Sequence, residues 1–224
     1  MCGFFIVKQI RRDAAKDMIQ RLHYTHSLGK VSIAFGLYDT RAKMNGLGIE
    51  SEQMVGVITF GQVSGRGLAQ SLFEGGTQDN TMELLRMVVI DDCECERSFF
   101  IAKAIKLLKM KFPEVKVIVS FSDFTQGHYG IVYQASNFIY CGKTGKKYHY
   151  MRNGKRVNKR FVFDKAKQMN ISENEFSKMR GFEKVEELPK FRYVYLLDKK
   201  SKLKLPVLEY PKPEAKVDDI LKAE

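Results

Sequence analysis

Two histidines separated by two residues are the first groups that could do chemistry. His23 and His26 lie in the segment His-Tyr-Thr-His, and Asp123 follows an apolar run later in the chain. An imidazole titrates near neutral pH and can accept a proton, and two imidazoles with one carboxylate form a ligand set of non-haem Fe(II). Hydrogen-bonded structural roles are the alternative. The sequence leaves base, metal ligand and structural group open for these histidines.

A second candidate is an anion-binding site at the start of a helix. An apolar helical pattern opens directly after Arg97-Ser98, and a β-type run precedes it. The first amides of a helix have no partners within the helix and lie at the positive end of its dipole, so they can bind a phosphate. An ordinary capped helix is the alternative. In the preceding run, Arg86 is a candidate clamp for a phosphate or carboxylate, and Glu83, three residues earlier, is expected on the opposite face of the strand.

The strongest local charge feature is a basic segment between Lys143 and Arg160. It holds eight Lys or Arg and no Asp or Glu, and aromatic residues are interleaved with the basic ones. Basic groups pair with phosphates, and aromatic faces can stack on an exposed base. We interpret the segment as a nucleic-acid interface, with a solvated basic surface as the alternative. The predicted contacts are Lys147, Tyr148, Tyr150, Arg152, Lys155, Arg156, Lys159 and Arg160.

The charge and composition of the whole chain agree with that interpretation. Its 224 residues carry a formal net charge of +12, which favours polyanionic partners. No apolar run approaches the ~20 residues needed to cross a bilayer, so no membrane association is expected. The four cysteines are too few and too irregular for a disulfide framework. These features predict a cytoplasmic protein, and they leave the oligomeric state open, a dimer included.

The candidate groups must be positioned by strands and helices that alternate along the chain. We expect a helix over 13–22, strands over 31–38 and 54–61, and a loop over 62–80. The most regular part follows, with strand 82–90, helix 98–112, strand 115–122, helix 130–136 and strand 138–142. Later elements are a helix over 172–178 with a capping box and a strand over 191–197. This order predicts an α/β fold, a mixed sheet of the α+β kind with helices packed against it.

The same patterns predict three parts of the chain. Residues 1–143 form the sheet-and-helix core, and residues 144–200 form a basic extension packed on that core. Residues 201–224, which contain three prolines and scattered charges, form an extended or disordered tail.

The run Tyr133-Gln-Ala-Ser-Asn-Phe138 resembles the Tyr-x-x-x-Gly-Phe segment of the GNAT superfamily of N-acetyltransferases. The resemblance implies a core that binds acetyl-CoA beside a splayed pair of parallel strands. It implies that Tyr133 is the general acid toward the departing thiolate, because a phenol is protonated at neutral pH. The cofactor would lie along Val88, Val89, Arg97, Ser98 and Asn137. The chain departs from the superfamily at the pyrophosphate loop, where Cys93-Glu-Cys-Glu-Arg-Ser98 replaces a glycine-rich motif.

Several segments in order resemble the Mom family of bacteriophage DNA-modification proteins. They are His23-Tyr24-Thr-His26, Glu83-Leu-Leu-Arg86, Ser120-Phe-Ser-Asp123, Gln126-Gly-His128, Lys147-Tyr-His-Tyr-Met-Arg152 and Lys190-Phe-Arg-Tyr193. The resemblance covers about residues 15–197. It implies carbamoylmethylation at N6 of adenine in double-stranded DNA, which protects phage DNA from restriction in the cytoplasm of a bacterial host. It also implies acetyl-CoA, and Fe(II) as a further requirement to be tested.

This resemblance defines a catalytic set of His23, Tyr24, His26, Arg86, Asp123 and Tyr133. Adenine N6 is a poor nucleophile because its lone pair is delocalised into the ring, so an enzyme must position the amine and remove a proton. We expect Asp123 to hydrogen-bond or deprotonate this amine, and the base to be flipped out of the stack. Two alternatives remain open: a GNAT acetyltransferase acting on a protein or small-molecule amine, and a non-catalytic DNA-binding protein.

Overall fold

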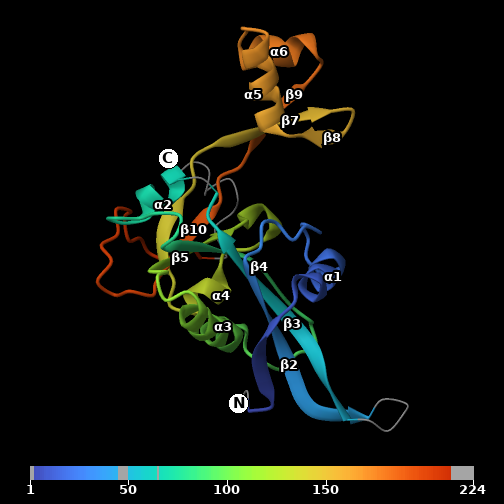
Figure 1. Cartoon of the computed structure of the whole chain (residues 1–224), viewed down its shortest axis with the longest axis vertical. Helices are drawn as coiled ribbons and strands as arrows, with labels where there is room; N and C mark the ends of the chain where they lie inside the picture. Colours follow the sequence, from blue (N-terminus) through green and yellow to red (C-terminus); the bar gives the residue numbers. More distant parts are fainter. Residues whose placement is uncertain (1–2, 45–49, 65, 213–224) are drawn as a thin grey trace. The chain divides into compact units, whose positions relative to one another are not determined.

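The computed structural model describes residues 3–44, 50–64 and 66–212, and these form two compact units (Figure 1). The second unit is Lys143–Lys190. The first unit contains the chain before it and the chain from Phe191 onward. The described backbone therefore leaves the first unit once and returns to it.

The first unit is built on a seven-stranded sheet in the order β1-β2-β3-β4-β5-β10-β6. Adjacent strands from β1 to β4 pair antiparallel, and so do β5 and β10, whereas β4 and β5 are parallel. The predicted α/β class with a mixed sheet is confirmed. The strands are β1 (Phe5–Ile10), β2 (Ile33–Met44), β3 (Glu50–Gln62), β4 (Thr81–Val89), β5 (Val117–Ser122), β6 (Ile139–Lys143) and β10 (Phe191–Leu196).

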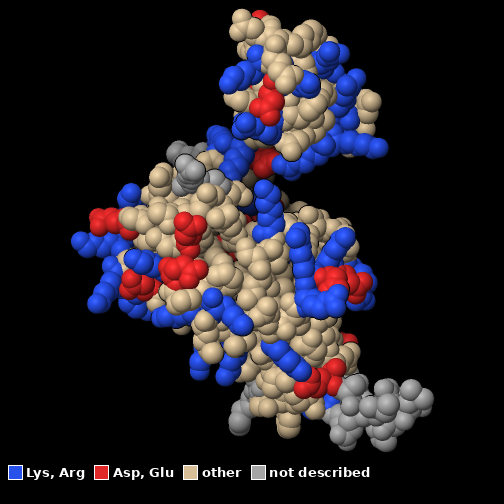
Figure 2. Space-filling view, viewed as in Figure 1, with Lys and Arg blue, Asp and Glu red and all other residues tan. Residues whose placement is uncertain are grey.

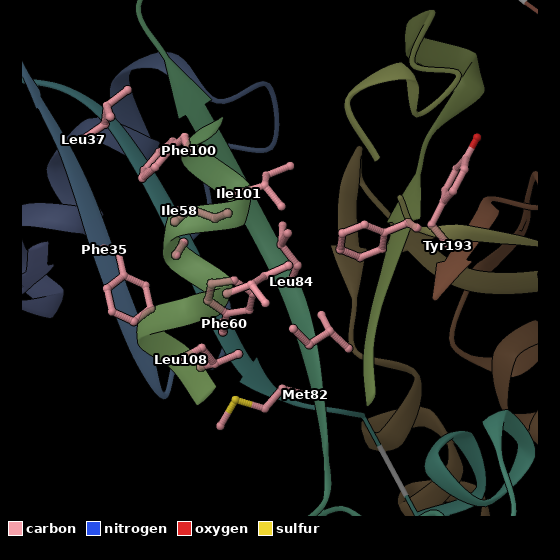
Figure 3. Close-up of a cluster of buried hydrophobic side chains, with 14 of the residues drawn as sticks. Phe35, Leu37, Ile58, Phe60, Met82, Leu84, Phe100, Ile101, Leu108 and Tyr193 are labelled. Carbon is pink, nitrogen blue, oxygen red and sulfur yellow. The ribbon is translucent and has the colours of Figure 1, made fainter. Parts of the chain in front are cut away.

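Helices cover both faces of this sheet because successive side chains of a strand point to opposite faces. One face packs on α3 through the larger core cluster, shown in Figure 3, and the other face packs on α1 through Ala34, Val57 and Val88. No helix in the described part of the chain is long and apolar enough to cross a membrane. The helices of this unit are α1 (Arg12–Leu22), α2 (Arg66–Leu72), α3 (Arg97–Lys111), the 3₁₀ turn η1 (Phe124–Gln126) and α4 (Ile131–Gln134).

Helix α3 forms where the apolar spacing predicted it. Ile101, Ala104, Ile105 and Leu108 are buried against the sheet, and burying an Ile or Leu side chain contributes about 1.5–3 kcal/mol. The helix ends at Lys111, two residues before Pro113, because proline cannot continue a helix. Local sequence and tertiary packing agree in this element.

Three elements of the first unit were not predicted: β1, α2 and the short 3₁₀ turn η1. Strand β1 is short and carries mixed polar and apolar residues, so only its pairing with β2 defines it. Helix α2 lies inside the expected loop over 62–80, whose glycine and serine content indicated irregular backbone. Ala69 and Leu72 of this helix are buried with Phe73 against β5 and β10, so tertiary packing outweighs the weak local preference.

The boundaries expected near the C-terminus need correction. Strand β10 belongs to the first unit, where it pairs with β5 from Phe191 to Leu196, and not to the basic extension expected over 144–200. The following segment packs on the core through Leu203 and Leu205, and Leu208 donates its backbone N–H to Tyr140 O. Residues 201–212 are thus irregular in backbone but held in place. Residues 213–224 of the expected tail lie outside the described residues.

The second unit is a small sheet in the order β8-β7-β9, with two helices on one face. Its core contains Tyr150, Val162, Ala166 and Phe176. The predicted capping box at Ser172 and Glu175 is confirmed. The elements are β7 (Lys147–Arg152), β8 (Lys155–Val157), α5 (Lys159–Gln168), α6 (Glu173–Met179) and β9 (Glu183–Glu187).

Two glycines in the loop between η1 and α4 allow a stability test. Gly130 has φ +76°, and a Cβ atom there would lie 2.3 Å from the ring of Tyr193. Gly127 has φ +70°, and a Cβ atom would meet nothing within 4 Å. Both alanine variants carry the backbone strain, of order 1–3 kcal/mol, and only Gly130→Ala adds a steric clash. We expect Gly130→Ala to lower the free energy of unfolding more than Gly127→Ala does, by urea denaturation. Equal losses would contradict the tight packing at Tyr193.

Candidate active site

The candidate active site lies where the two parallel strands separate. β4 pairs with β5 only over Thr81–Glu83, whereas its pairing with β3 continues to Val89. One residue beyond the last parallel pair, the hydroxyl of Ser120 donates to the main-chain oxygen of Leu84 at 3.1 Å, in a buried position. A buried carbonyl needs a partner, and here a side chain supplies it after the ladder has ended. This bond fixes the point at which the strands part.

Tyr133 of α4 reaches the same point. Its ring packs against Phe138 and Tyr193, each with a centroid distance of 5.4 Å, and its phenol is hydrogen-bonded to the Ser120 hydroxyl. The single hydroxyl hydrogen of Ser120 is used on Leu84 O, so Ser120 accepts from the phenol. If the phenol loses its proton, the serine hydrogen can turn to the phenolate. Ser120 can therefore stabilise Tyr133 in both protonation states.

The environment of Tyr133 keeps its phenol protonated. Burial is the largest effect and raises the pKa of Tyr133, while the hydrogen bond with Ser120 lowers it. Tyr24, Arg86 and Glu83 also lie close enough to influence this pKa. Two residues of β4 and one that follows α1 are thus within electrostatic range of the phenol.

A β-bulge places Glu83 and Arg86 on the same face of the sheet. In the β3–β4 ladder Arg86 is opposite Thr59, Leu84 is opposite Phe60 and Glu83 is opposite Gly61. The register shift leaves one extra residue in β4, and such an insertion reverses the alternation of side chains along the strand. The expectation that Glu83 and Arg86 point to opposite faces was wrong for this reason.

Arg86 is anchored to the chain that follows α1. Its Nε donates to Thr25 Oγ1 and to Ser27 O, both at 3.0 Å, and its Nη1 donates to Leu85 O at 2.6 Å. Within the described part of the chain these bonds occupy Nε and Nη1, so the Nη2 hydrogens can serve an anionic group. The geometry is compatible with the predicted clamp.

The same contacts determine the protonation state of His23. The backbone N–H of Thr25 donates to His23 Nδ1 at 3.1 Å, and Thr25 Oγ1 lies 2.9 Å from the same nitrogen. A backbone N–H can only donate, so Nδ1 carries the lone pair and the proton of the neutral ring is on Nε2. Burial, with Arg86 next in effect, lowers the pKa of His23 to about 4. At neutral pH His23 is therefore a neutral hydrogen-bond donor at Nε2, and the expected role as general base is not supported.

Tyr24 lies between two imidazole rings. Its ring stacks on His23 with a centroid distance of 4.5 Å and on His128 at 5.6 Å, and both interplanar angles are below 30°. Tyr24 is 46% exposed. The three rings form a half-open aromatic stack beside Arg86, a surface against which a planar ligand could lie.

His26 has a different role from His23. Its Nδ1 donates to Gln20 O at 2.8 Å, and its φ of 47° places it in a left-handed turn after α1. Among the residues that the structure describes, no three His, Cys, Asp or Glu side chains form a group that could hold a metal ion. The predicted Fe(II) ligand set of His23, His26 and Asp123 is therefore not assembled.

Asp123 lies at the end of β5, as predicted, and caps the 3₁₀ turn η1. Its Oδ1 accepts from the Thr125 backbone N–H at 3.2 Å and from the Thr125 hydroxyl at 2.6 Å. These bonds fix the rotamer of the carboxylate. They also give Asp123 a local structural role that the sequence analysis did not include.

The residues expected along a cofactor occupy β4, the start of α3 and the turn after α4. Val88 is buried in the core cluster against α1, and Val89 is partly buried against the cluster packed on α3, so their backbone is the main surface that they offer a ligand. Arg97 and Ser98 open α3, whose first turn contains no acidic residue. Asn137 is exposed and has a φ of 60° in a turn, a conformation that asparagine tolerates.

The two glutamates before α3 have partners. Glu94 forms an ion pair with Arg41 at 2.5 Å, and Glu96 accepts from Ser98 Oγ at 3.5 Å. The pairing with Arg41 offsets one of the charges that would repel a pyrophosphate at this helix start. The segment 91–96 contains no glycine, and Cys95 is buried within it.

The predicted nucleic-acid contacts lie in the second unit, and two of them need correction. Tyr150 is 2% exposed and belongs to the core, so it cannot stack on a base. The ring of Tyr148 is covered by two ammonium groups, Lys159 Nζ at 3.7 Å and Lys184 Nζ at 4.1 Å from its centroid. The six basic residues of the predicted set are exposed: Lys147, Arg152, Lys155, Arg156, Lys159 and Arg160.

Sequence reasoning missed three residues that build this site. They are Ser120, Thr25 and His128, and each lies in a segment that resembles the Mom family, close in sequence to a candidate residue. Their roles depend on contacts between segments far apart in the sequence, such as Arg86 with Thr25 and Tyr24 with His128. The spacing of residues within one segment cannot predict such contacts.

Comparison with known proteins gives a family. The family described as the Mom protein family matches residues 4–212. The chain belongs to the Mom protein family. One relative is the protein named methylcarbamoylase mom of Escherichia phage Mu, which is 26% identical over 215 residues, 88% of this chain and 80% of that protein. The predicted Mom-type resemblance is confirmed.

Solved structures similar to this Mom-family chain include acetyltransferases with low sequence identity. NAA60 of Arabidopsis thaliana in complex with acetyl-CoA has a TM-score of 0.47 and 12% identity, covering 87% of this chain and 99% of that one. A putative acetyltransferase of Acinetobacter baylyi has a TM-score of 0.45 and 12% identity, covering 88% and 93%.

The protonation state of His23 can be tested by NMR of nitrogen-15-labelled histidine. We expect the Nε2–H tautomer at neutral pH and a titration midpoint at about 4, assigned by loss of the signal in His23→Gln. A folded-state pKa below the ordinary value of 6.5 means that the contribution of His23 to stability is present above about pH 6.5 and is lost as the pH falls through about 4. A midpoint near 6.5 would refute this environment.

The bond between Tyr133 and Ser120 can be tested by a double-mutant cycle. Tyr133→Phe and Ser120→Ala each remove it, and Ser120→Ala also leaves Leu84 O without its donor, so the serine variant should be the less stable. We expect the two losses in unfolding free energy to be non-additive by about 0.5–1.5 kcal/mol, measured by urea denaturation. Strict additivity would show that the two hydroxyls do not interact.

Proposed function

We propose that this chain transfers a carbamoylmethyl group to N6 of adenine in double-stranded DNA and so protects phage DNA from restriction. The observation that carries the proposal is the match to the Mom protein family over residues 4–212, with 26% identity to a protein named methylcarbamoylase. The convergence of Tyr133, Arg86 and the His23–Tyr24–His128 stack supports it, because these groups could bind a planar base and supply proton donors beside it.

An acyl-CoA donor fits part of the site. Beyond Glu83 the edge of β4 has no ladder to β5, so its backbone could pair with an extended ligand, as could the first amides of α3 beside Arg97. The pairing of Glu94 with Arg41 removes one obstacle to a pyrophosphate. When bound, such a donor would supply two carbons and a thiolate leaving group. Joining N6 to its methyl carbon and converting its thioester to the amide would further need a two-electron oxidant and an ammonia-level nitrogen donor. The proposed contacts of the acyl-CoA donor are Val88, Val89, Arg97, Ser98 and, at the turn after α4, Asn137.

The protein groups would divide the remaining chemistry among them. The Tyr133 phenol, kept protonated by burial, would donate a proton to a leaving group, a role worth about 10²–10⁴-fold in rate. His23 Nε2–H and Arg86 Nη2 would orient polar atoms of the substrate. Asp123, with its rotamer fixed by Thr125, would hydrogen-bond the N6 amine and help to remove its proton.

DNA would be held by the second unit. Residues 143–190 contain fourteen Lys or Arg and six Asp or Glu, a net charge of +8. Lysine and arginine side chains cover much of the visible face of this unit in Figure 2. Such a surface binds the phosphate backbone in a salt-dependent way, with Lys155 and Arg152 at the β7–β8 turn among its exposed members.

Nucleoside analysis tests the proposed reaction directly. DNA from bacteria that express the chain should yield a deoxyadenosine heavier by one carbamoylmethyl group in mass spectrometry of the nuclease digest. Tyr133→Phe should lower the rate at which this nucleoside accumulates by about 10²–10⁴-fold, because the proton donor is lost. Tyr38→Phe, which removes the phenol of a tyrosine on β2 outside the candidate site, is the matched control and should retain most of the product.

The alternatives predict different results. An acetyltransferase acting on a protein or small amine would leave adenine unmodified, and a non-catalytic DNA-binding protein would give no product with any variant. An entirely unmodified adenine pool in cells with abundant folded wild-type protein would overturn the proposal.

A further inference from the structure

The second unit contains a groove that none of the preceding roles uses. It lies between α5, α6 and the strands β7 and β9, and its volume is about 910 Å³, within the size range of small-molecule sites. All of its lining residues belong to the unit 143–190. Its walls combine aromatic rings, ammonium groups and a carboxylate.

One wall of the groove is an exposed phenylalanine. Phe163 is 42% exposed on α5. The guanidinium of Arg160 lies 5.6 Å from the centroid of its ring. Exposing a large apolar ring to water is unfavourable, and a ring beside basic groups is the element on which proteins stack single bases. Tyr148, capped by Lys159 and Lys184, forms a second part of the wall.

The groove also contains a hydrogen-bond acceptor. Glu173 accepts from the hydroxyls of Tyr148 at 3.3 Å and Tyr150 at 3.2 Å. Burial, with the charge of Glu173 next in effect, raises the pKa of Tyr150 to about 12, so this phenol stays a donor. An ionised carboxylate offers about four acceptor positions, so two tyrosine hydroxyls leave capacity for an amine of a ligand.

The charged groups around the groove suit a ligand with one anionic end. Lys167 and Lys184 line it. Of the two carboxylates that line it, Glu175 is engaged in the capping box with Ser172. A flat ring with an amine and a neighbouring phosphate matches this combination.

We propose that the groove binds one unstacked nucleotide, with its base against Phe163, its amine on Glu173 and its phosphate on Lys167 or Lys184. The inference rests on the proposed function only in taking the nucleotide from DNA, because a free nucleotide has the same chemistry. It assigns base stacking to Phe163, a residue outside the segment first expected to bind nucleic acid, and it gives Tyr150 a supporting role beneath the groove.

The test measures affinity of the full chain for labelled duplexes by fluorescence anisotropy. One duplex carries a single unpaired adenosine, and a second carries an abasic residue at that position. Phe163→Ala should weaken binding of the first duplex by about 5- to 100-fold, the effect of losing one base–aromatic stack. The abasic change should weaken wild type by a similar factor and should have no further effect in Phe163→Ala, because both changes remove the same contact.

Matched controls come from the same unit. Phe161→Ala removes a ring that is 47% exposed on the other flank of α5, and Glu183→Gln removes a carboxylate from the outer face of β9. Both should bind like wild type, whereas Glu173→Gln should weaken binding of the unpaired adenosine. Thermal melting verifies that each variant is folded.

The outcomes separate this inference from the proposed function. If wild type binds DNA and Phe163→Ala binds it equally well, the groove proposal is wrong and the proposed function stands. If wild type binds neither DNA nor free adenosine monophosphate, both fail. Binding of free adenosine monophosphate that is lost in Phe163→Ala, without any preference for the unpaired base over the abasic site, would retain the groove and assign it to a free nucleotide.

Discussion

The structure of the candidate site depends on where two parallel strands stop pairing. β4 and β5 share only three residue pairs, and the next carbonyl, that of Leu84, would be buried without a partner if Ser120 did not donate to it. A missing partner at such a position costs about 1–3 kcal/mol, comparable to a large fraction of the stability of a domain. The serine that satisfies this backbone group also receives the Tyr133 phenol. Sheet architecture and site chemistry therefore share one hydroxyl.

A second network holds the other side of the site. Arg86 donates to Thr25, and Thr25 contacts Nδ1 of His23, so the arginine of the central strand fixes the loop after α1 and the tautomer of its histidine. The stack of His23, Tyr24 and His128 then brings in the loop after β5. Segments around residues 25, 86 and 128 thus form a continuous set of contacts although they are far apart in the chain.

Much of the first unit could be predicted from its sequence because local and global preferences agree there. The apolar spacing of α3 and Pro113 after its end each have a local physical cause, and so does the capping box at Ser172 in the second unit. The site was predicted less well. Tyr133, Arg86 and Tyr24 were identified from the sequence, and Arg86 contacts the loop that carries Tyr24. Of the roles left open for the histidines, a general base at His23 is disfavoured and the ligand set with His26 and Asp123 is not assembled, because hydrogen bonds with Thr25 and Gln20 decide what the two histidines can do. Tyr150 was assigned to DNA from composition, whereas strand alternation buries it.

The extra residue in β4 has a consequence for how such chains can vary. Because Leu85 has no cross-strand partner, Glu83 and Arg86 share a face, and removing one residue here would restore strict alternation and turn Arg86 away from Thr25. The number of residues in β4 therefore determines to which face Arg86 points. A sequence comparison that shifts the alignment by a single position between 83 and 86 would pair the arginine with a residue facing the other side of the sheet.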